Sequence, residues 1–312
     1  MYNNILFTCV GKKAHLIKQF IASIQLNSYD IKCYATDSSK YAAGLYFADD
    51  FFISPNSDSD LYKDFIFNKC KKNAIGLIIP VTDYDLEFFA NNKKYFNDFG
   101  ISVMVPSKNN IMKYRDKILT AKIFSENSIS YPKTYTIDDL SLCSKIISRP
   151  IDGSGSQGIS IFEKKDFNKD IFNNDRLIIQ EFIDGYEVTC DALVSDSILL
   201  AASQRRRLKV REGEVMNAKM IAHKGIYNNL EKMPLAFNME DGLYTIQCII
   251  KNNKPYFIEI NPRFGGGAPM TIAAGLDLPS ALIKKFIFKK DMDISTEINL
   301  IEMIRWDDAV FI

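Results

Sequence analysis

The first hundred residues alternate short apolar runs with segments of helical periodicity. Between the runs, segments such as 15–25 and 83–96 repeat apolar side chains at helical spacing. Strands that alternate with helices build a parallel sheet wrapped by helices. We therefore predict an α/β, Rossmann-like domain over residues 1–112, with strands at 4–10, 31–36, 51–54, 74–80 and 101–106.

The first turn of this domain does not have a dinucleotide signature. Gly11 follows the first apolar run and Asp37 follows the second, as in open nucleotide-binding sheets. The stretch "TCVGKKAH" nevertheless lacks the full G-x-G-x-x-G pattern. We expect a structural turn at Gly11.

A different architecture is predicted beyond residue 112. Residues 115–135 indicate a helix that starts near Asp116 and breaks before Pro132. Short turns then separate the apolar runs, which favours antiparallel pairing and α+β character. We place a small domain at 113–180 and a larger one at 181–312, with strands at 145–150, 158–162, 176–182, 187–195, 197–203, 243–250 and 255–261.

Charge and composition exclude several classes of protein. The chain has 39 basic and 38 acidic residues, a formal net charge of +1, which gives no sign of binding to nucleic acid or membrane. It has no signal-like or membrane-spanning apolar stretch, so we expect a cytoplasmic protein. The six cysteines and two histidines are scattered, which argues against a zinc site or a Cys-His nucleophile.

The stretch "YFIEINPRFGGG" (256–267) predicts a polar face on a late strand. Side chains alternate along a strand, so Glu259, Asn261 and Arg263 share one face, with Phe257, Ile258 and Ile260 as the buried flank. Carboxylate and amide oxygens suit magnesium, and arginine binds phosphate oxygens. The alternative is an edge strand with solvated polar side chains.

A glycine-rich loop lies in "RPIDGSGSQGISIF" (149–162). Glycine permits backbone N–H groups to fold over an anion. The loop is not a Walker loop, because no G-K-[ST] follows it. Anion binding and a flexible hairpin turn stay equally open for Gly153, Ser154, Gly155, Ser156 and Gly158.

The segment "LIIQEFIDGYEVTCD" (177–191) could cross the back of a nucleotide cleft. Backbone groups of Phe182 and Ile183 would then face an adenine edge, and a carboxylate would accept ribose hydroxyls. An ordinary hairpin through Asp184 and Gly185 is the alternative, and spacing alone does not separate the two.

A basic segment, "SQRRRLKVREGE" (203–214), offers an anion site. In an extended strand its alternate cations would share one face and repel each other unless anions intervene; they are Arg205, Arg207, Lys209 and Arg211. We expect the carboxylates of an amino-acid-like or otherwise acidic substrate here, with a solvated sheet face as the alternative. Gly265, Gly266 and Gly267 would line an acceptor pocket or permit a tight turn.

Taken together, these stretches resemble the ATP-grasp superfamily, and most closely the synthetase halves of the carbamoyl phosphate synthase large subunit. The resemblance covers nearly the whole chain through four ordered motifs: "LIIPVTDYDLEFFA" with "RDK", "RPIDGSGSQGI", "QEFIDGYEVTCD" and "IEINPRFGGG". It implies an ATP-grasp fold behind a Rossmann-like domain.

The resemblance also implies roles for individual residues. Lys117 and Arg149 would contact the nucleotide phosphates, Glu181 and Ile183 would hold adenine, and Glu187 would hold the ribose. Metal ligands would be Gln247, Glu259 and Asn261, and the catalytic pair would be Arg263 and Asn261. Relatives carry substrate-binding arginines near Arg205 and Arg207.

The chemistry implied by the family is ADP-producing carbon–nitrogen ligation. ATP phosphorylates a small carboxylic acid, and an amine or ammonia attacks the acyl phosphate, with Mg²⁺ as the cofactor and Mn²⁺ as its substitute. Phosphoryl transfer needs alignment and charge neutralisation more than a protein nucleophile, which agrees with these residues.

The chain has one set of motifs, so a stand-alone ligase, monomeric or homodimeric, fits better than carbamoyl phosphate synthesis. A nucleotide-binding subunit that acts only with a partner is the alternative, and a kinase that releases the acyl phosphate is a third reading.

Overall fold

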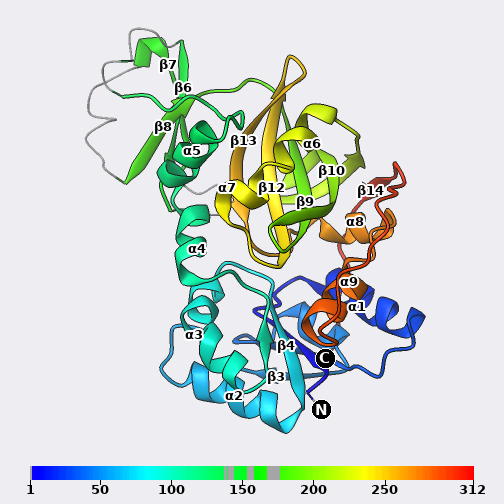
Figure 1. Cartoon of the computed structure of the whole chain (residues 1–312). Coiled ribbons are helices and arrows are strands. Elements are labelled where there is room, and N and C mark those ends of the chain that lie inside the picture. Colours follow the sequence, from blue (N-terminus) through cyan, green and yellow to red (C-terminus); the bar gives the residue numbers. More distant parts are fainter. Residues whose placement is uncertain (1, 137–138, 140–143, 153–157, 167–175) are drawn as a thin grey trace.

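The computed structural model of the chain describes residues 2–136, 139, 144–152, 158–166 and 176–312. Within these residues the strands form a five-stranded, a six-stranded and a three-stranded sheet. Figure 1 shows the N-terminal sheet at the bottom, the six-stranded sheet above it and the three-stranded sheet at the upper left. The predicted combination of a parallel-sheet domain with antiparallel sheets is confirmed.

The N-terminal sheet is parallel, in the order β3-β2-β1-β4-β5. Chain order reverses between β1 and β4, and open α/β sheets bind ligands beyond the carboxyl ends of strands at such a switch point. The fifth strand is shorter than predicted. The strands are β1 (Asn4–Thr8), β2 (Cys33–Asp37), β3 (Asp50–Ile53), β4 (Ile75–Pro80) and β5 (Ser102–Val103).

Helices cover both faces of this sheet. One face packs against α1 (Ala14–Leu26) and, from the far end of the chain, α9 (Leu278–Phe286). The other face packs against α2 (Tyr62–Lys72) and α3 (Leu86–Asp98). Leu278, Leu282 and Ile283 of α9 belong to the core that the sheet shares with α1. The short helix η1 (Ala43–Phe47) connects β2 to β3.

Two helices lead out of the N-terminal domain. They are α4 (Lys108–Arg115) and α5 (Lys117–Glu126). Asp116 separates them because its carboxylate accepts hydrogen bonds from the N–H groups of Ile118 (2.9 Å) and Leu119 (3.0 Å) and so caps α5. The predicted helix start near Asp116 is confirmed, and the predicted limit between 112 and 113 falls inside α4. The domain limits stay predictions.

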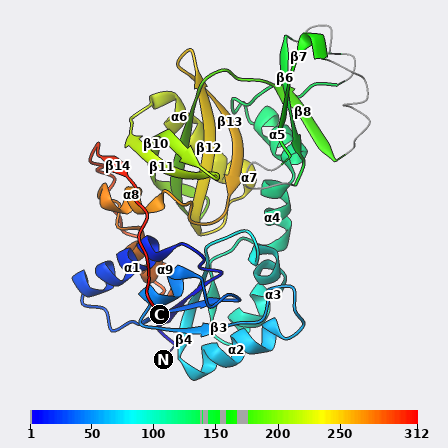
Figure 2. The ribbon, with the colours of Figure 1, turned by 180° about the vertical axis from the view of Figure 1, so that it is seen from behind.

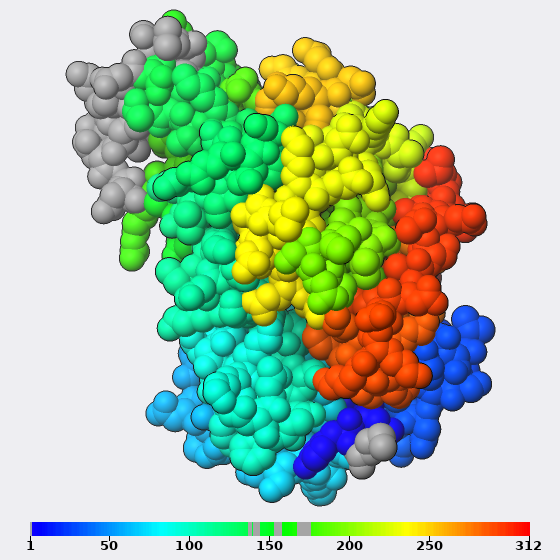
Figure 3. Space-filling view, in the orientation of Figure 1, coloured from blue at the N-terminus to red at the C-terminus, as the bar shows by residue number. Residues whose placement is uncertain are grey.

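The three-stranded sheet has the order β7-β6-β8 and is antiparallel. It consists of β6 (Lys145–Pro150), β7 (Ser160–Glu163) and β8 (Leu177–Glu181), with the short helix η3 (Lys164–Asp166) after β7. In the space-filling view it forms a separate lobe at the upper left (Figure 3). We call this lobe the lid sheet.

The six-stranded sheet is antiparallel, in the order β13-β12-β9-β10-β11-β14. One of its faces packs with α5, α6 and α7 around a core that includes Val188, Cys190, Ile246 and Phe257. This leaves the other face for polar side chains. The new elements are β9 (Tyr186–Ser195), β10 (Ile198–Arg211), β11 (Glu214–Met220), α6 (Lys224–Leu230), α7 (Met233–Phe237), β12 (Gly242–Lys251), β13 (Lys254–Asn261), α8 (Ala268–Ala273) and β14 (Glu302–Ile304).

The C-terminal segment joins the two main parts. After α9 the chain reaches β14 at the edge of the six-stranded sheet, and it then returns beside α1 to end near the N-terminal sheet (Figure 2). Five of the cysteines are free thiols, while Cys143 lies outside the described residues. In the described part of the chain no helix has the length and apolarity needed to cross a membrane.

Candidate active site

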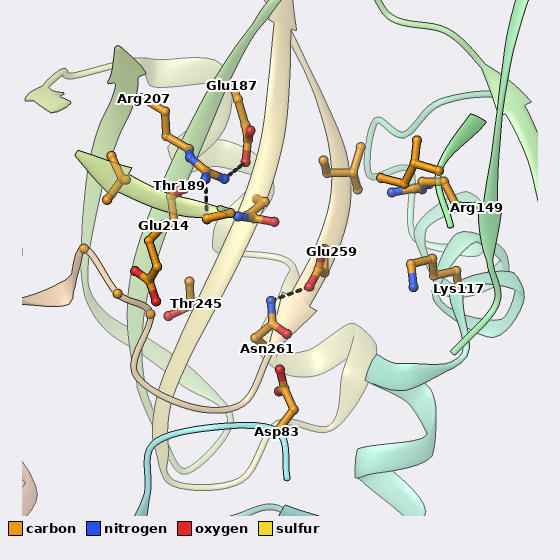
Figure 4. A pocket seen from close by; sticks show the side chains of 18 of the residues that line it. Asp83, Lys117, Arg149, Glu187, Thr189, Arg207, Glu214, Thr245, Glu259 and Asn261 are labelled. Atoms are coloured by element: carbon orange, nitrogen blue, oxygen red, sulfur yellow. Dashed lines mark hydrogen bonds and ion pairs between the residues drawn. The ribbon is translucent and has the colours of Figure 1, made fainter. Parts of the chain in front are cut away.

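A cavity of about 770 Å³ lies on the polar face of the six-stranded sheet. Its walls come from the six-stranded sheet, the lid sheet and the loops at the carboxyl ends of β1 and β4. Figure 4 shows Lys117 and Arg149 at one end and Arg207 and Glu214 at the other, with Glu259 and Asn261 between them. Residues far apart in the sequence therefore surround one space.

Strand register brings the polar side chains into rows. Glu259 on β13 lies opposite Gln247 on β12, which lies opposite Thr189 on β9. Thr189 in turn lies opposite Arg205 on β10. Directly paired residues share a face of the sheet, so this row points into the cavity as one set. Asn261 and its partner Thr245 form the next row.

A β-bulge in β13 modifies the predicted pattern. The register shifts so that Gln247 pairs with Glu259 but Cys248 pairs with Phe257, leaving Ile258 as the extra residue. Because of the bulge, Phe257 points into the core, whereas Glu259, two positions later, lines the cavity on the other face of the sheet. Ile258, which we expected on the buried flank, is half-buried and lines the cavity instead.

The metal ligands expected from sequence lie together. Gln247, Glu259 and Asn261 all line the cavity, and Asn261 Nδ2 donates to Glu259 Oε1 at 2.8 Å. The described residues contain no cluster of three or more His, Cys, Asp or Glu side chains that could hold a metal. One carboxylate with two amide oxygens is a hard, incomplete ligand set, which suits Mg²⁺ shared with phosphate oxygens. The metal roles of these residues stay predictions.

Two cations face Glu259 from the lid side of the cavity. Lys117 starts α5, and Arg149 on β6 is buried, with Nη2 donating to Gln180 Oε1 and Nε without a partner among the described residues. Burial lowers the pKa of both groups, and the charge of Glu259 partly opposes this. A buried guanidinium whose Nε has no acceptor among the described residues favours an anionic ligand. Phosphate contact by these residues remains a prediction.

Arg263 is held by an aspartate that the sequence analysis did not identify. Asp83, in the loop after β4, accepts from Arg263 Nε at 2.7 Å. Burial lowers the pKa of Arg263, but Asp83, Glu259 and Glu214 outweigh burial and raise it. Arg263 is therefore a permanent cation. Pro262 follows the end of β13, so Arg263 stands on a loop rather than on the strand.

The expected adenine segment lines the same cavity. Glu181, Phe182 and Ile183 all contribute to the wall. The N–H of Glu181 donates to the carbonyl of Lys133 at 2.8 Å, and that of Phe182 to Lys145 at 3.4 Å. Two of these backbone donors are thus already engaged, which leaves their carbonyls and the Ile183 backbone as the adenine contacts to test.

The glycine-rich loop lies mostly outside the described residues. Gly153, Ser154, Gly155 and Ser156 belong to the part that the structure does not describe, so their role stays a prediction. Gly158 has φ +69°, and a Cβ there would come within 2.9 Å of Pro150 Cγ. Glycine at this position is therefore required by local geometry.

The basic segment does not form the predicted row of four cations. Register shifts on both sides of Lys209 break the alternation, and Lys209 and Arg211 lie outside the cavity wall. Carboxylates of the protein, rather than ligand anions, neutralise three of these cations. The pairs are Arg205 with Asp191, Arg207 with Glu187, and Arg211 with Asp307.

Arg205 and Arg207 nevertheless both line the cavity. Arg205 is only 1% exposed and also donates to Thr271 Oγ1 at 3.0 Å, so its first role is structural. Arg207 holds Glu187, the residue expected at the ribose, and donates to the Gly213 carbonyl at 2.7 Å. Direct contact of either arginine with a substrate stays a prediction.

The glycines after Arg263 make room for side chains rather than only for a turn. A Cβ on Gly266 would lie 1.6 Å from Glu214 Oε2, and one on Gly267 would lie 2.6 Å from Arg205 Nε. Gly266 itself lines the cavity. The loop can thus pass close to β10 and β11 only because these positions have no side chains.

Sequence reasoning missed six charged residues in the cavity wall, among them Lys13, Asp83 and Glu214. Lys13 and Asp83 follow β1 and β4, the strands at the switch point, and that placement could have indicated them. Glu214 lies on a hairpin turn, and nothing in its local sequence points to a site.

Two family descriptions match the chain. Residues 114–267 match "ATP-grasp domain", and residues 5–104 match "PylC-like, N-terminal domain". The biotin carboxylase domain of 2-oxoglutarate carboxylase from Hydrogenobacter thermophilus superposes with a TM-score of 0.74 at 14% identity, covering 96% of this chain and 73% of that one. This likeness shows the fold.

Two relatives match at the sequence level. The carbamoyl phosphate synthase large chain of Thermoanaerobacter sp. is 24% identical over 216 residues, 61% of this chain and 20% of that protein. Tyramine–L-glutamate ligase of Methanocaldococcus jannaschii is 25% identical over 196 residues, 62% of this chain and 57% of that protein. The matches thus span less than two thirds of either relative. Residues 114–267 are therefore an ATP-grasp domain, and residues 5–104 ahead of them are a PylC-like N-terminal domain.

Proposed function

We propose that this protein is an ATP-dependent carboxylate–amine ligase that activates a small carboxylic acid as an acyl phosphate. The observation that carries the proposal is the convergence of Glu259, Asn261 and Gln247 with the cations Lys117, Arg149 and Arg263 on one cavity. Acidic and amide oxygens with surrounding cations are what phosphoryl transfer requires, since it depends on alignment and charge neutralisation.

The cavity wall has oxygen-bearing side chains that suit Mg²⁺ and cationic side chains that suit the phosphates of ATP. Glu259, Gln247 and Asn261 would hold the metal, which supplies charge neutralisation to the phosphates when bound. Lys117 and Arg149 would bind phosphate oxygens, and the glycine-rich loop from 153 to 158 would cover them. Segment 181–183 would contact adenine, and Glu187 would accept the ribose hydroxyls.

The reaction then proceeds in two steps. A carboxylate oxygen of the acid attacks the γ-phosphorus, ADP leaves, and an acyl phosphate forms. The neutral amine attacks the acyl carbon, phosphate leaves, and the amine loses a proton as the C–N bond forms. Arg263 neutralises charge on the transferring phosphoryl group, and its fixed position means that little reorganisation is needed at the transition state.

Amino acids are the acid class that the charges favour. The cavity wall carries both signs of charge, and carboxylates of the protein separate its arginines. A ligand with both an ammonium and a carboxylate matches such a wall better than a simple fatty acid. The name of the tyramine–L-glutamate ligase, in which an amino acid is one of the joined molecules, supports this choice.

The proposal is tested by following ADP release with ATP, magnesium and a panel of carboxylic acids, with hydroxylamine in place of the amine. Hydroxylamine captures an acyl phosphate as a hydroxamate. ADP and hydroxamate that appear together, and only with particular acids, support the ligase. Nucleotide binding without ADP release from any acid would contradict it and favour a binding subunit. ADP release that needs no amine or hydroxylamine would indicate a kinase.

A further inference from the structure

Three charged side chains meet at the end of the cavity farthest from Lys117. Glu214, at the start of β11, receives Lys13 Nζ on Oε1 at 2.9 Å and Arg305 Nη1 on Oε2 at 3.2 Å. Lys13 comes from the loop after β1, and Arg305 follows β14 in the C-terminal segment. Three separate parts of the chain therefore build this cluster, which we call the Glu214 triad.

The triad borders the reaction site. Lys13 and Glu214 line the same cavity as Glu259, and the charge of Glu214 acts on Arg263. Gly266, three residues after Arg263, leaves the space in which the Glu214 carboxylate lies. A small molecule bound at the triad would therefore lie beside the loop that carries Arg263.

The triad keeps capacity for further hydrogen bonds. A carboxylate has about four acceptor positions, and two are in use on Glu214. An ammonium has three donors, and Lys13 Nζ uses one among the described residues. The side chains of Lys13, Arg305 and Glu214 are 14%, 20% and 45% exposed, so they are accessible yet partly removed from water.

We propose that Lys13, Glu214 and Arg305 recognise the charged head of an α-amino acid, which is the acid substrate of the reaction proposed above. Its ammonium binds Glu214, and its α-carboxylate binds Lys13 and Arg305. The order of charges in the triad, positive, negative, positive, matches a zwitterion with one additional cation. Charge-assisted hydrogen bonds to both ends make the recognition specific.

The ionisation of Glu214 indicates that the acid substrate, rather than the attacking amine, binds at the triad. Burial opposes its ionised form, but Lys13 and Arg305 outweigh burial and hold the pKa of this carboxyl below its ordinary value. It is therefore a weak base that keeps a bound ammonium protonated. A protonated amine has no lone pair with which to attack an acyl phosphate, so the amino group is recognised and does not react.

The test compares each of the twenty L-amino acids with the acid that lacks its α-amino group, by calorimetric titration in the presence of magnesium and a non-hydrolysable ATP analogue. We expect at least one amino acid to bind about 10-fold or more tightly than its partner. Glu214→Gln should reduce this preference to about 2-fold or less. Lys13→Met should weaken the binding of the amino acid and of its partner acid by the same factor. Glu302→Gln, on exposed β14 and 4.0 Å from Lys219, is the control and should change neither.

Gly266→Ala is the second variant, because its Cβ displaces the Glu214 carboxylate without removing it. It should also lose the preference, even if Glu214→Gln fails to fold. If Glu214→Gln or Gly266→Ala folds and still prefers the amino acid, the triad has only a structural role and the proposal is overturned, whatever the melting temperature of the variant. A wild-type protein without any preference also overturns it.

ADP release is measured in parallel. Release with acids that have no amino group supports the ligase but not this subsite. Glu214-dependent amino acid binding without ADP release leaves the subsite standing without the ligase.

Discussion

Asp83, after β4, and Arg263, after β13, form a paired contact across 180 positions of sequence: Arg263 Nε donates to Asp83 Oδ1 at 2.7 Å, and Nη2 donates to Oδ2 at 2.5 Å. Among the residues that the structure describes, the remaining nitrogen, Nη1, has only a 3.4 Å contact with the Phe264 carbonyl. The contact between Asp83 and Arg263 couples the loop after β4 to the loop after β13.

Asp83→Asn should lower kcat by about 10- to 100-fold, since it weakens two charge-assisted hydrogen bonds that orient Arg263. The KM for ATP should change less. Steady-state ADP release measures both constants. Asp98→Asn, which removes an exposed i,i+4 partner of Lys94, should have no effect. An unchanged kcat in Asp83→Asn would show that Arg263 does not depend on Asp83.

Glu259→Gln should reduce ADP formation by on the order of 100-fold or more, because it removes the one carboxylate among the three expected metal ligands. The side chain is half-buried and its partner Asn261 can still bond to an amide, so the melting temperature should change little. Enzyme assay and thermal unfolding check the two parts. Retained activity at ordinary magnesium concentration would remove Glu259 from the metal site.

Arg205→Ala should destabilise the protein by about 3 to 5 kcal/mol, because it leaves Asp191 buried without its cation. Arg206, the next residue, is exposed and stacks over Tyr186 at 4.1 Å. Arg206→Ala should cost about 1 kcal/mol or less. Urea unfolding gives both values. A stable Arg205→Ala protein with a raised KM for the acid would instead make Arg205 a substrate contact.

Arg207→Ala should raise the KM for ATP more than the KM for the acid. Arg207 orients Glu187, and Glu187 is the carboxylate expected at the ribose. Varying each substrate at saturating levels of the other separates the two constants. If the KM for the acid rises and that for ATP does not, Arg207 binds the acid, as the sequence alone had indicated.

Asp85 should make stability fall as the pH rises from about 4 to 6. Asp85 is fully buried, and burial raises its pKa from 3.8 to about 6, although the hydroxyl of Tyr62 donates to it at 3.2 Å. Between these values the folded chain binds more protons than the unfolded chain, so unfolding becomes easier as the pH rises, by about 3 kcal/mol in all.

The pH effect is isolated by comparing the protein with Asp85→Asn, which stays neutral. The difference in unfolding free energy should shift in favour of the variant between pH 4 and 6.5 and then stay constant. A difference that is independent of pH would mean that Asp85 is ionised in the fold at all these values.

The positions of most strands along the chain and the main site motifs could be predicted from the sequence. Apolar periodicity is a local property, and it was enough to locate the strands of the parallel sheet and most of those in the antiparallel sheets. The motif around Glu259 and Asn261 is also local, because alternation along one strand decides that both face the same way.

Departures arose where neighbouring strands changed the register. The bulge at Ile258 put Phe257 in the core and Ile258 at the cavity, and the shifts around Lys209 removed two cations from the predicted row. A bulge depends on how two strands pair, so the pattern of one strand does not reveal it. The same applies to the carboxylates that neutralise Arg205 and Arg207, which stand on β9.

By itself, the sequence determined most of the strands and several of the helices, and it indicated which segments carry groups suited to phosphate and metal chemistry, because periodicity and side-chain type are local properties of each segment. Only the tertiary structure decided that Lys13, Asp83 and Glu214 line the same cavity and that Arg305 pairs with Glu214. Their positions follow from the packing of the N-terminal sheet, the β10–β11 hairpin and the C-terminal segment around one cavity. Contacts between groups so distant in the chain depend on the closure of the whole fold, and no local preference specifies them.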